Sequence, residues 1–176
     1  QPAARYDLTV PGITAKGRLA ALQAGQEGPV GDHAEAVLAD IARTYRYEAL
    51  GQQAAQAYAE RRMRHGDYVA ALAMADASAG PPGADHSGAS VDAALAARIL
   101  RILLVEPGKA LPAPADRVAL YWRYQGYATP GVSGDDIRLG AARLMLAERL
   151  PDAALTVLKQ LADVTAAKPD VVLLRA

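Results

Sequence analysis

The short turn at Gly66-Asp67 constrains the fold more than any other feature, because it joins two stretches whose apolar residues recur every three or four positions. The apolar positions are Ala55, Tyr58, Ala59 and Met63 before the turn, and Tyr68, Ala71, Leu72 and Ala75 after it. This spacing is typical of amphipathic helices, and so tight a connection makes the two helices antiparallel neighbours. The sequence therefore predicts a helical hairpin over about residues 48–78.

A related pattern returns over residues 142–161, with Leu150-Pro151-Asp152 at the turn. Hairpins that each leave one apolar face open are stabilised by stacking on one another. Helical periodicity also predicts helices over about 14–24, 32–45, 90–106, 115–126, 135–149 and 151–166, and another from Pro169. Asp32, Ser90 and Asp135 are the expected helix starts. We expect one all-α domain over 1–176, an α-solenoid of about eight helices, with an extended lead-in at 1–13 and a long flexible loop at 79–90.

The composition favours many closely packed helices over one bulky core. Alanine makes up about a quarter of the 176 residues and phenylalanine is absent. Alanine has the highest helix propensity and lets helix axes approach toward the short end of the ~8–10 Å range. The absence of cysteine excludes disulfides and thiolate metal sites, and it leaves the cellular compartment open between cytoplasm and periplasm.

Charge and hydropathy exclude two classes of partner. The formal net charge is zero, so the chain lacks the positive field typical of nucleic-acid binders. The longest apolar stretch, residues 99–105, contains Arg101 and is far shorter than the ~20 residues of a membrane span. The chain starts at Gln1, so we expect a fragment of a larger protein, and its excess of arginine over lysine with abundant alanine is typical of GC-rich bacterial genes.

The run Gly66-Asp67-Tyr68, with Ala59 seven residues earlier and Ala71 and Ala75 behind it, resembles the tetratricopeptide repeat. The segment from 142 to 161 looks like the same unit. The family's aromatic residue late in the second helix is missing, since Ala75 and Leu158 stand there, and two such units would be degenerate. The resemblance implies a right-handed stack whose concave face holds a peptide or protein, and it transfers no catalytic residue.

The densest aromatic cluster consists of Tyr121, Trp122, Tyr124 and Tyr127. One face of this helix is a candidate wall for a partner, because tyrosine and tryptophan provide large contact area at low entropic cost. The alternative is that the helix packs on both neighbours and all four rings belong to the core. Arg123 lies among the rings and either reaches an acidic group or is solvated.

Arginines provide the other candidate contacts. Arg61, Arg62, Arg64 and His65 form a basic cluster that receives an acidic peptide or a phosphate, or that merely complements a helix C-terminus. Arg98 and Arg101 form a polar stripe that faces either the groove or solvent. The predicted partner-binding residues are Tyr121, Trp122, Arg123, Tyr124, Arg98, Arg101 and Arg62.

No pattern predicts a catalytic, cofactor or metal site. His33, His65 and His86 are scattered, and Asp135-Asp136 suits a helix start. Phosphate loops and nucleophile elbows are absent from the sequence. We therefore expect a non-catalytic scaffold that binds a peptide or protein segment in a concave groove, as part of a bacterial multi-protein or envelope assembly. The alternative is a structural domain that self-associates through the apolar run Val171 to Leu174, and an enzymatic or lytic accessory role is a third reading.

Overall fold

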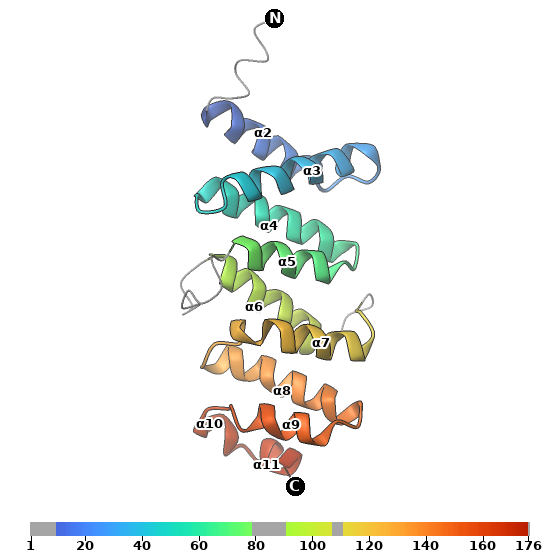
Figure 1. Cartoon of the computed structure of the whole chain (residues 1–176), viewed down its shortest axis with the longest axis vertical. Coiled ribbons are helices and arrows are strands. Elements are labelled where there is room, and N and C mark those ends of the chain that lie inside the picture. The colour runs from blue at the N-terminus through green and yellow to red at the C-terminus, as the bar shows by residue number, and fades with distance from the viewer. Residues whose placement is uncertain (1–9, 79–90, 107–110, 176) are drawn as a thin grey trace, which may run out of the picture. The chain divides into compact units, whose positions relative to one another are not determined.

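The computed structural model describes residues 10–78, 91–106 and 111–175, and every regular element within these ranges is a helix (Figure 1). The all-α fold class is therefore confirmed, whereas the stacking of hairpins into a solenoid stays a prediction. The contacts divide the chain into two compact units, unit 1 (residues 1–84) and unit 2 (residues 85–176). That the two form the single domain expected from the sequence also stays a prediction.

Unit 1 contains α2 (Val10–Gln23), α3 (Pro29–Thr44), α4 (Ala49–Arg64) and α5 (Tyr68–Ser78). α3 packs against α2 and α4, α4 packs against α5, and α2 also contacts α4. Small side chains fill the contacts between these helices: Ala34, Leu38, Ala42, Ala55, Ala59, Ala71, Leu72 and Ala75 are almost fully buried. Because alanine lets the backbones approach closely, this unit forms a core without phenylalanine.

The turn at Gly66 forms as the sequence predicts. Gly66 has a positive φ of 76°. The amide of Gly66 donates to the carbonyl of Met63 (3.0 Å), and the amide of Asp67 donates to that of Arg62 (2.9 Å). These two bonds define a Schellman motif, in which glycine adopts the left-handed conformation without a Cβ clash. The Asp67 carboxylate then accepts the amide of Ala70 (3.0 Å) and so starts the next helix.

Unit 2 contains α6 (Val91–Leu104), α7 (Pro114–Tyr124), the 3-10 turn η1 (Gln125–Tyr127), α8 (Val132–Ala147), α9 (Pro151–Leu158), α10 (Asp163–Ala166) and α11 (Pro169–Arg175). α8 packs against α6, α7 and α9. The fully buried side chains include Ile99, Leu100, Leu103, Tyr121, Ile137, Met145, Val157, Leu158 and Val171. A Cβ at Gly140 would lie 2.5 Å from the carbonyl oxygen of Leu104, so glycine permits the close crossing of α8 and α6.

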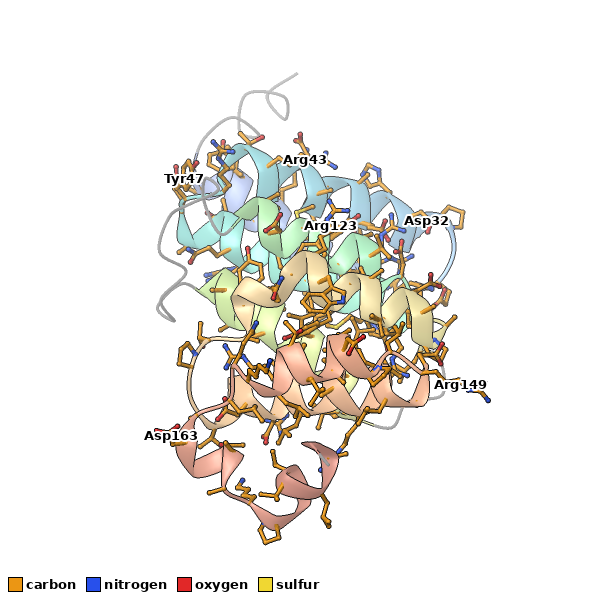
Figure 2. All side chains as sticks on the ribbon, turned by 60° about the horizontal axis from the view of Figure 1, so that its bottom comes forward. Asp32, Arg43, Tyr47, Arg123, Arg149 and Asp163 are labelled. Carbon is orange, nitrogen blue, oxygen red and sulfur yellow. The ribbon has the colours of Figure 1, made fainter. Side chains whose placement is uncertain are left out.

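The α8–α9 turn repeats the hydrogen-bond pattern of the α4–α5 turn. The amide of Arg149 donates to the carbonyl of Leu146 (3.1 Å), and the amide of Leu150 donates to that of Met145 (2.8 Å). Arg149 takes the left-handed position with φ 61° and extends away from the helix (Figure 2). Pro151 is the first residue of α9, as predicted. The two hairpins matched in sequence therefore close in the same way.

Two predicted helix starts are wrong because a residue with special backbone geometry precedes them. α3 begins at Pro29 after Gly28 (φ 76°), so Asp32 lies inside its first turn and is not the cap. α8 begins at Val132 after Gly131 (φ 126°), so Asp135 lies inside this helix too. Glycine provides these conformations without strain, and neither helix start has a side-chain cap hydrogen bond.

Two further boundaries differ from the prediction. α2 begins at Val10, not Thr14, and proline at position 11 is tolerated in a first turn, so residues 10–13 of the expected lead-in are helical. α9 ends at Leu158, not Ala166. The chain turns tightly after Leu158, buries Leu161, and then forms the short α10. The expected loop at 79–90, the start at Ser90 and residues 1–9 of the lead-in lie outside the described residues.

Candidate functional site

The aromatic cluster expected to contact a partner lies mostly inside unit 2. Tyr121, Tyr124 and Tyr127 are buried, and Trp122 is half-buried. The rings of Tyr121 and Trp122 meet edge to face, with centroids 5.4 Å apart. This burial supports the core interpretation of three of the four rings. A partner contact through Trp122 stays a prediction.

Three of the predicted arginines lie on the surface of unit 2. Arg123 is exposed on α7, with its guanidinium carbon 5.2 Å from the ring centroid of Tyr124 (Figure 2). Arg98 and Arg101 are exposed on α6, and Arg101 Nε lies 3.9 Å from Glu106 Oε1. An exposed ion pair of this length contributes little to stability, so Glu106 does not prevent Arg101 from contacting a partner. Their partner-binding role stays a prediction.

Arg62 is held by partners within unit 1. Its guanidinium pairs with Glu35, lies 3.2 Å from Asp67 Oδ2, and donates from Nε to the hydroxyl of Tyr58 (3.1 Å). Burial opposes its charge, yet the Tyr58 hydrogen bond and the two carboxylates raise the pKa of Arg62 above its ordinary value. An external acid would have to displace these internal partners, so the geometry favours a structural role.

Arg61 is a buried structural residue that the sequence analysis treated as part of a surface cluster. Its guanidinium donates to the carbonyls of Ala24 (3.0 Å) and Gln26 (2.7 Å), and to the carboxylates of Glu35 (3.0 Å) and Asp32 (2.9 Å). Only 2% of its side chain is exposed. Arg61 therefore ties α4 to α3 and to the α2–α3 connection. One signal was available: position 61 continues the apolar helical stripe through 54 and 58.

A second buried ion pair lies in unit 2. The Asp135 carboxylate accepts from Arg138 Nη1 (3.2 Å), from the hydroxyl of Thr165 (2.6 Å) and from the amide of Ala162 (3.4 Å). Arg138 Nη2 donates to the carbonyl of Ala128 (2.5 Å). Asp135 therefore joins α8 to α10, and it does not merely complement a helix start.

The ion pairs Arg61–Asp32 and Arg138–Asp135 belong to one repeated local structure. Residues 28–32 and 131–135 share the pattern Gly-x-x-Gly-Asp at the start of α3 and α8. In each, the second glycine is buried, and a Cβ there would overlap the carbonyl oxygen of Gln26 or Thr129. In each, an arginine binds both the aspartate and a carbonyl of the preceding connection. The repeat passed unnoticed in the sequence because its five-residue motif carries little apolar periodicity.

A groove lies between α2 and α3. Its volume is about 440 Å³, within the range of ligand and peptide sites. It is lined by Gly12, Ala15, Lys16, Leu19, Ala20 and Gln23 of α2, and by His33, Ala34 and Val37 of α3. Leu19 is 55% exposed although it lines this groove. The sequence does not predict this site, since the apolar pattern of residues 14–24 indicates only a short helix.

The charge of the groove is one-sided. Among the described residues that line it, Lys16 and His33 are the ionisable ones, and none of them is a carboxylate. Within the described residues no ion pair joins Lys16 to a carboxylate. Asp40 is exposed on α3 but lies outside the lining. The groove therefore presents apolar walls with a cationic edge.

The described residues contain neither a candidate metal site nor a helix that could cross a membrane. Histidine, aspartate and glutamate nowhere gather there in a group of three or more that is placed to hold a metal ion. None of the helices in these ranges has the length and apolarity to cross a membrane.

Comparisons with protein-family models, with curated proteins and with solved structures each find no match to this chain. The resemblance to tetratricopeptide repeats therefore depends on the sequence pattern alone.

Proposed function

We propose that this chain is a non-catalytic binding module whose α2–α3 groove takes a peptide or protein segment. The observation that carries the proposal is an apolar groove of about 440 Å³ with a half-exposed leucine in its wall. Contiguous exposed apolar surface is unfavourable in water, and in soluble proteins it commonly marks an interaction site. Apolar side chains of a partner would cover Leu19 and Val37.

We further propose that the hairpins are degenerate tetratricopeptide-like units, in a bacterial multi-protein or envelope assembly. The support is the shared Schellman turn of the α4–α5 and α8–α9 hairpins, together with the alanine-rich packing of unit 1. In such an arrangement the helical surfaces provide contacts and the chain performs no chemistry.

The test is a selection of peptides from a random library on the immobilised chain. Selected peptides should bind the wild type and Leu22→Ser, and should lose at least about tenfold in affinity for Leu19→Ser. Leu22 is a matched control because it lies on the same helix, is 78% exposed and does not line the groove. Equal binding to all three proteins, or no enrichment of any peptide, would refute this site.

A second candidate function is self-association through α11. Val172 and Leu173 are 53% and 77% exposed, whereas Val171 is fully buried. Adjacent exposed aliphatic residues favour association with a second copy. If this reading holds, the mass measured by sedimentation rises with protein concentration, and the double substitution Val172→Lys with Leu173→Glu keeps the chain monomeric and helical. A wild type that is monomeric at all concentrations contradicts it.

A further inference from the structure

We infer that the segment bound in the α2–α3 groove is an amphipathic helix with an aliphatic stripe and flanking carboxylates. This inference rests on the proposed function, because it names the class of partner for the same groove. Two properties of the α2–α3 groove support the acidic helix: the shape of its walls and the charge of its lining residues.

The shape of the groove suits a helix. Its walls are two helices, and the lining residues of each are spaced three or four apart. His33, Ala34 and Val37 recur at helical spacing on α3. Helices pack by fitting rows of side chains into such grooves. On a different side of α2, at Gly17 and Ala21, α4 already packs across the same pair of helices.

The charge of the groove suits an acidic partner. Lys16 and His33 line it, none of its described lining residues is a carboxylate, and the sequence of α2 contains Lys16 and Arg18 but no acidic residue. A carboxylate beside the partner's aliphatic stripe would find an accessible ammonium group at Lys16. Complementary charge of this kind raises the association rate and discriminates among partners.

Other occupants fit the groove less well. A second copy of α2 would bring like charges together at Lys16. An anionic bilayer attracts basic amphipathic helices, but it requires a convex apolar face with several cations, whereas this surface is concave and α2 has two. The acidic helix therefore agrees best with both shape and charge.

The experiment measures binding of three model peptides to the full chain by fluorescence anisotropy. Each peptide is lactam-bridged into a helix and carries leucines at i, i+3, i+4 and i+7, flanked by glutamate, glutamine or lysine. The glutamate peptide should bind tightest, about three- to tenfold more tightly than the glutamine peptide at low salt. This preference should shrink as salt screens the charges.

Charge reversal localises the effect. Lys16→Glu should weaken the glutamate peptide about tenfold and strengthen the lysine peptide, whereas Arg18→Glu should change neither by more than about twofold. Arg18 is the matched control because it makes the same charge change on the same helix, is exposed and does not line the groove.

The outcomes separate the inference from the proposed function. If the three peptides bind equally well and Leu19→Ser abolishes all three, the groove binds helices but the acidic preference is wrong. If none binds, the inference is wrong, and the proposed function stands only if library peptides of another kind bind. Co-sedimentation with phosphatidylglycerol vesicles that Lys16→Glu abolishes, or a dimer that Leu19→Ser dissociates, would assign the groove to a lipid surface or to a second copy and overturn the inference.

Discussion

Replacing Arg61 by methionine tests whether this buried guanidinium holds unit 1 together. Methionine keeps most of the aliphatic length and removes all four hydrogen bonds. The carboxylate of Glu35 keeps its pair with Arg62, and that of Asp32 is 73% exposed and is readily hydrated. The carbonyl of Ala24 keeps its bond from Arg64 (2.9 Å), so the carbonyl of Gln26 suffers the largest loss.

These terms give the expected magnitude. A hydrogen bond to a charged group contributes about 1.5–3 kcal/mol, and breaking a fully buried ion pair costs about 3–5 kcal/mol. Because two of the four acceptors keep a protein partner and a third reaches water, we expect a loss of about 3 kcal/mol. With a urea m-value of about 1–2 kcal/mol/M, the midpoint falls by about 2 M.

The assay is urea unfolding followed by circular dichroism at 222 nm, with Arg43→Met as the control. Arg43 is exposed near the end of α3 (Figure 2), and its substitution should change stability by less than about 0.5 kcal/mol. Amide hydrogen exchange in residues 24–35 should also accelerate in Arg61→Met. If the midpoint of Arg61→Met moves no further than that of Arg43→Met, Arg61 does not hold these elements.

Three further substitutions test the packing. Ala71→Leu should overpack the α4–α5 contact and lower the free energy of unfolding by about 1–3 kcal/mol. Ala73→Leu is the control, because Ala73 lies on the exposed side of α5, and it should be close to neutral. Equal melting temperatures of the two variants would contradict the burial of Ala71. Arg149→Gly should raise the free energy of unfolding by about 0.5–1 kcal/mol, because glycine removes the strain of a left-handed backbone at this exposed position. The greater freedom of glycine in the unfolded chain offsets part of this gain. A lower midpoint of urea unfolding would argue against the strain. Burial raises the pKa of Tyr121 above its ordinary value of about 10, so its contribution is present below pH 10 and is lost as the pH rises through the folded-state pKa. Stability should therefore fall more steeply above pH 10 in the wild type than in Tyr121→Phe, and identical alkaline profiles would contradict the burial.

Helix type and the main hairpin were predictable because they depend on local periodicity and on one glycine. The apolar spacing around Gly66 predicts α4 and α5 almost to the residue, since glycine and Asp67 fix the turn without help from distant parts of the chain. The end of α9 was not predictable in this way. The Thr165 hydroxyl reaches the Asp135 carboxylate 30 positions earlier in the chain, and such a tertiary bond leaves no local pattern.

The candidate site was mostly beyond prediction from sequence for a related reason. Charge clustering indicates a surface for Arg61 and Arg62, but their acceptors lie up to 37 positions away, so Arg61 is buried in unit 1 and Arg62 is held by internal carboxylates. The α2–α3 groove depends on which sides of α2 and α3 are left uncovered by the other helices of unit 1. The sequence of α2 specifies a helix and does not reveal which of its sides packs against α4.

The most direct test of the central claim, binding in the α2–α3 groove, is a methyl NMR titration of the full chain with a library-selected peptide. The account predicts that the shifted signals are those of Ala15, Leu19, Ala20, Ala34 and Val37, with saturation at one peptide per chain. Shifts concentrated instead at Val172 and Leu173, with those groove signals unchanged, would contradict it.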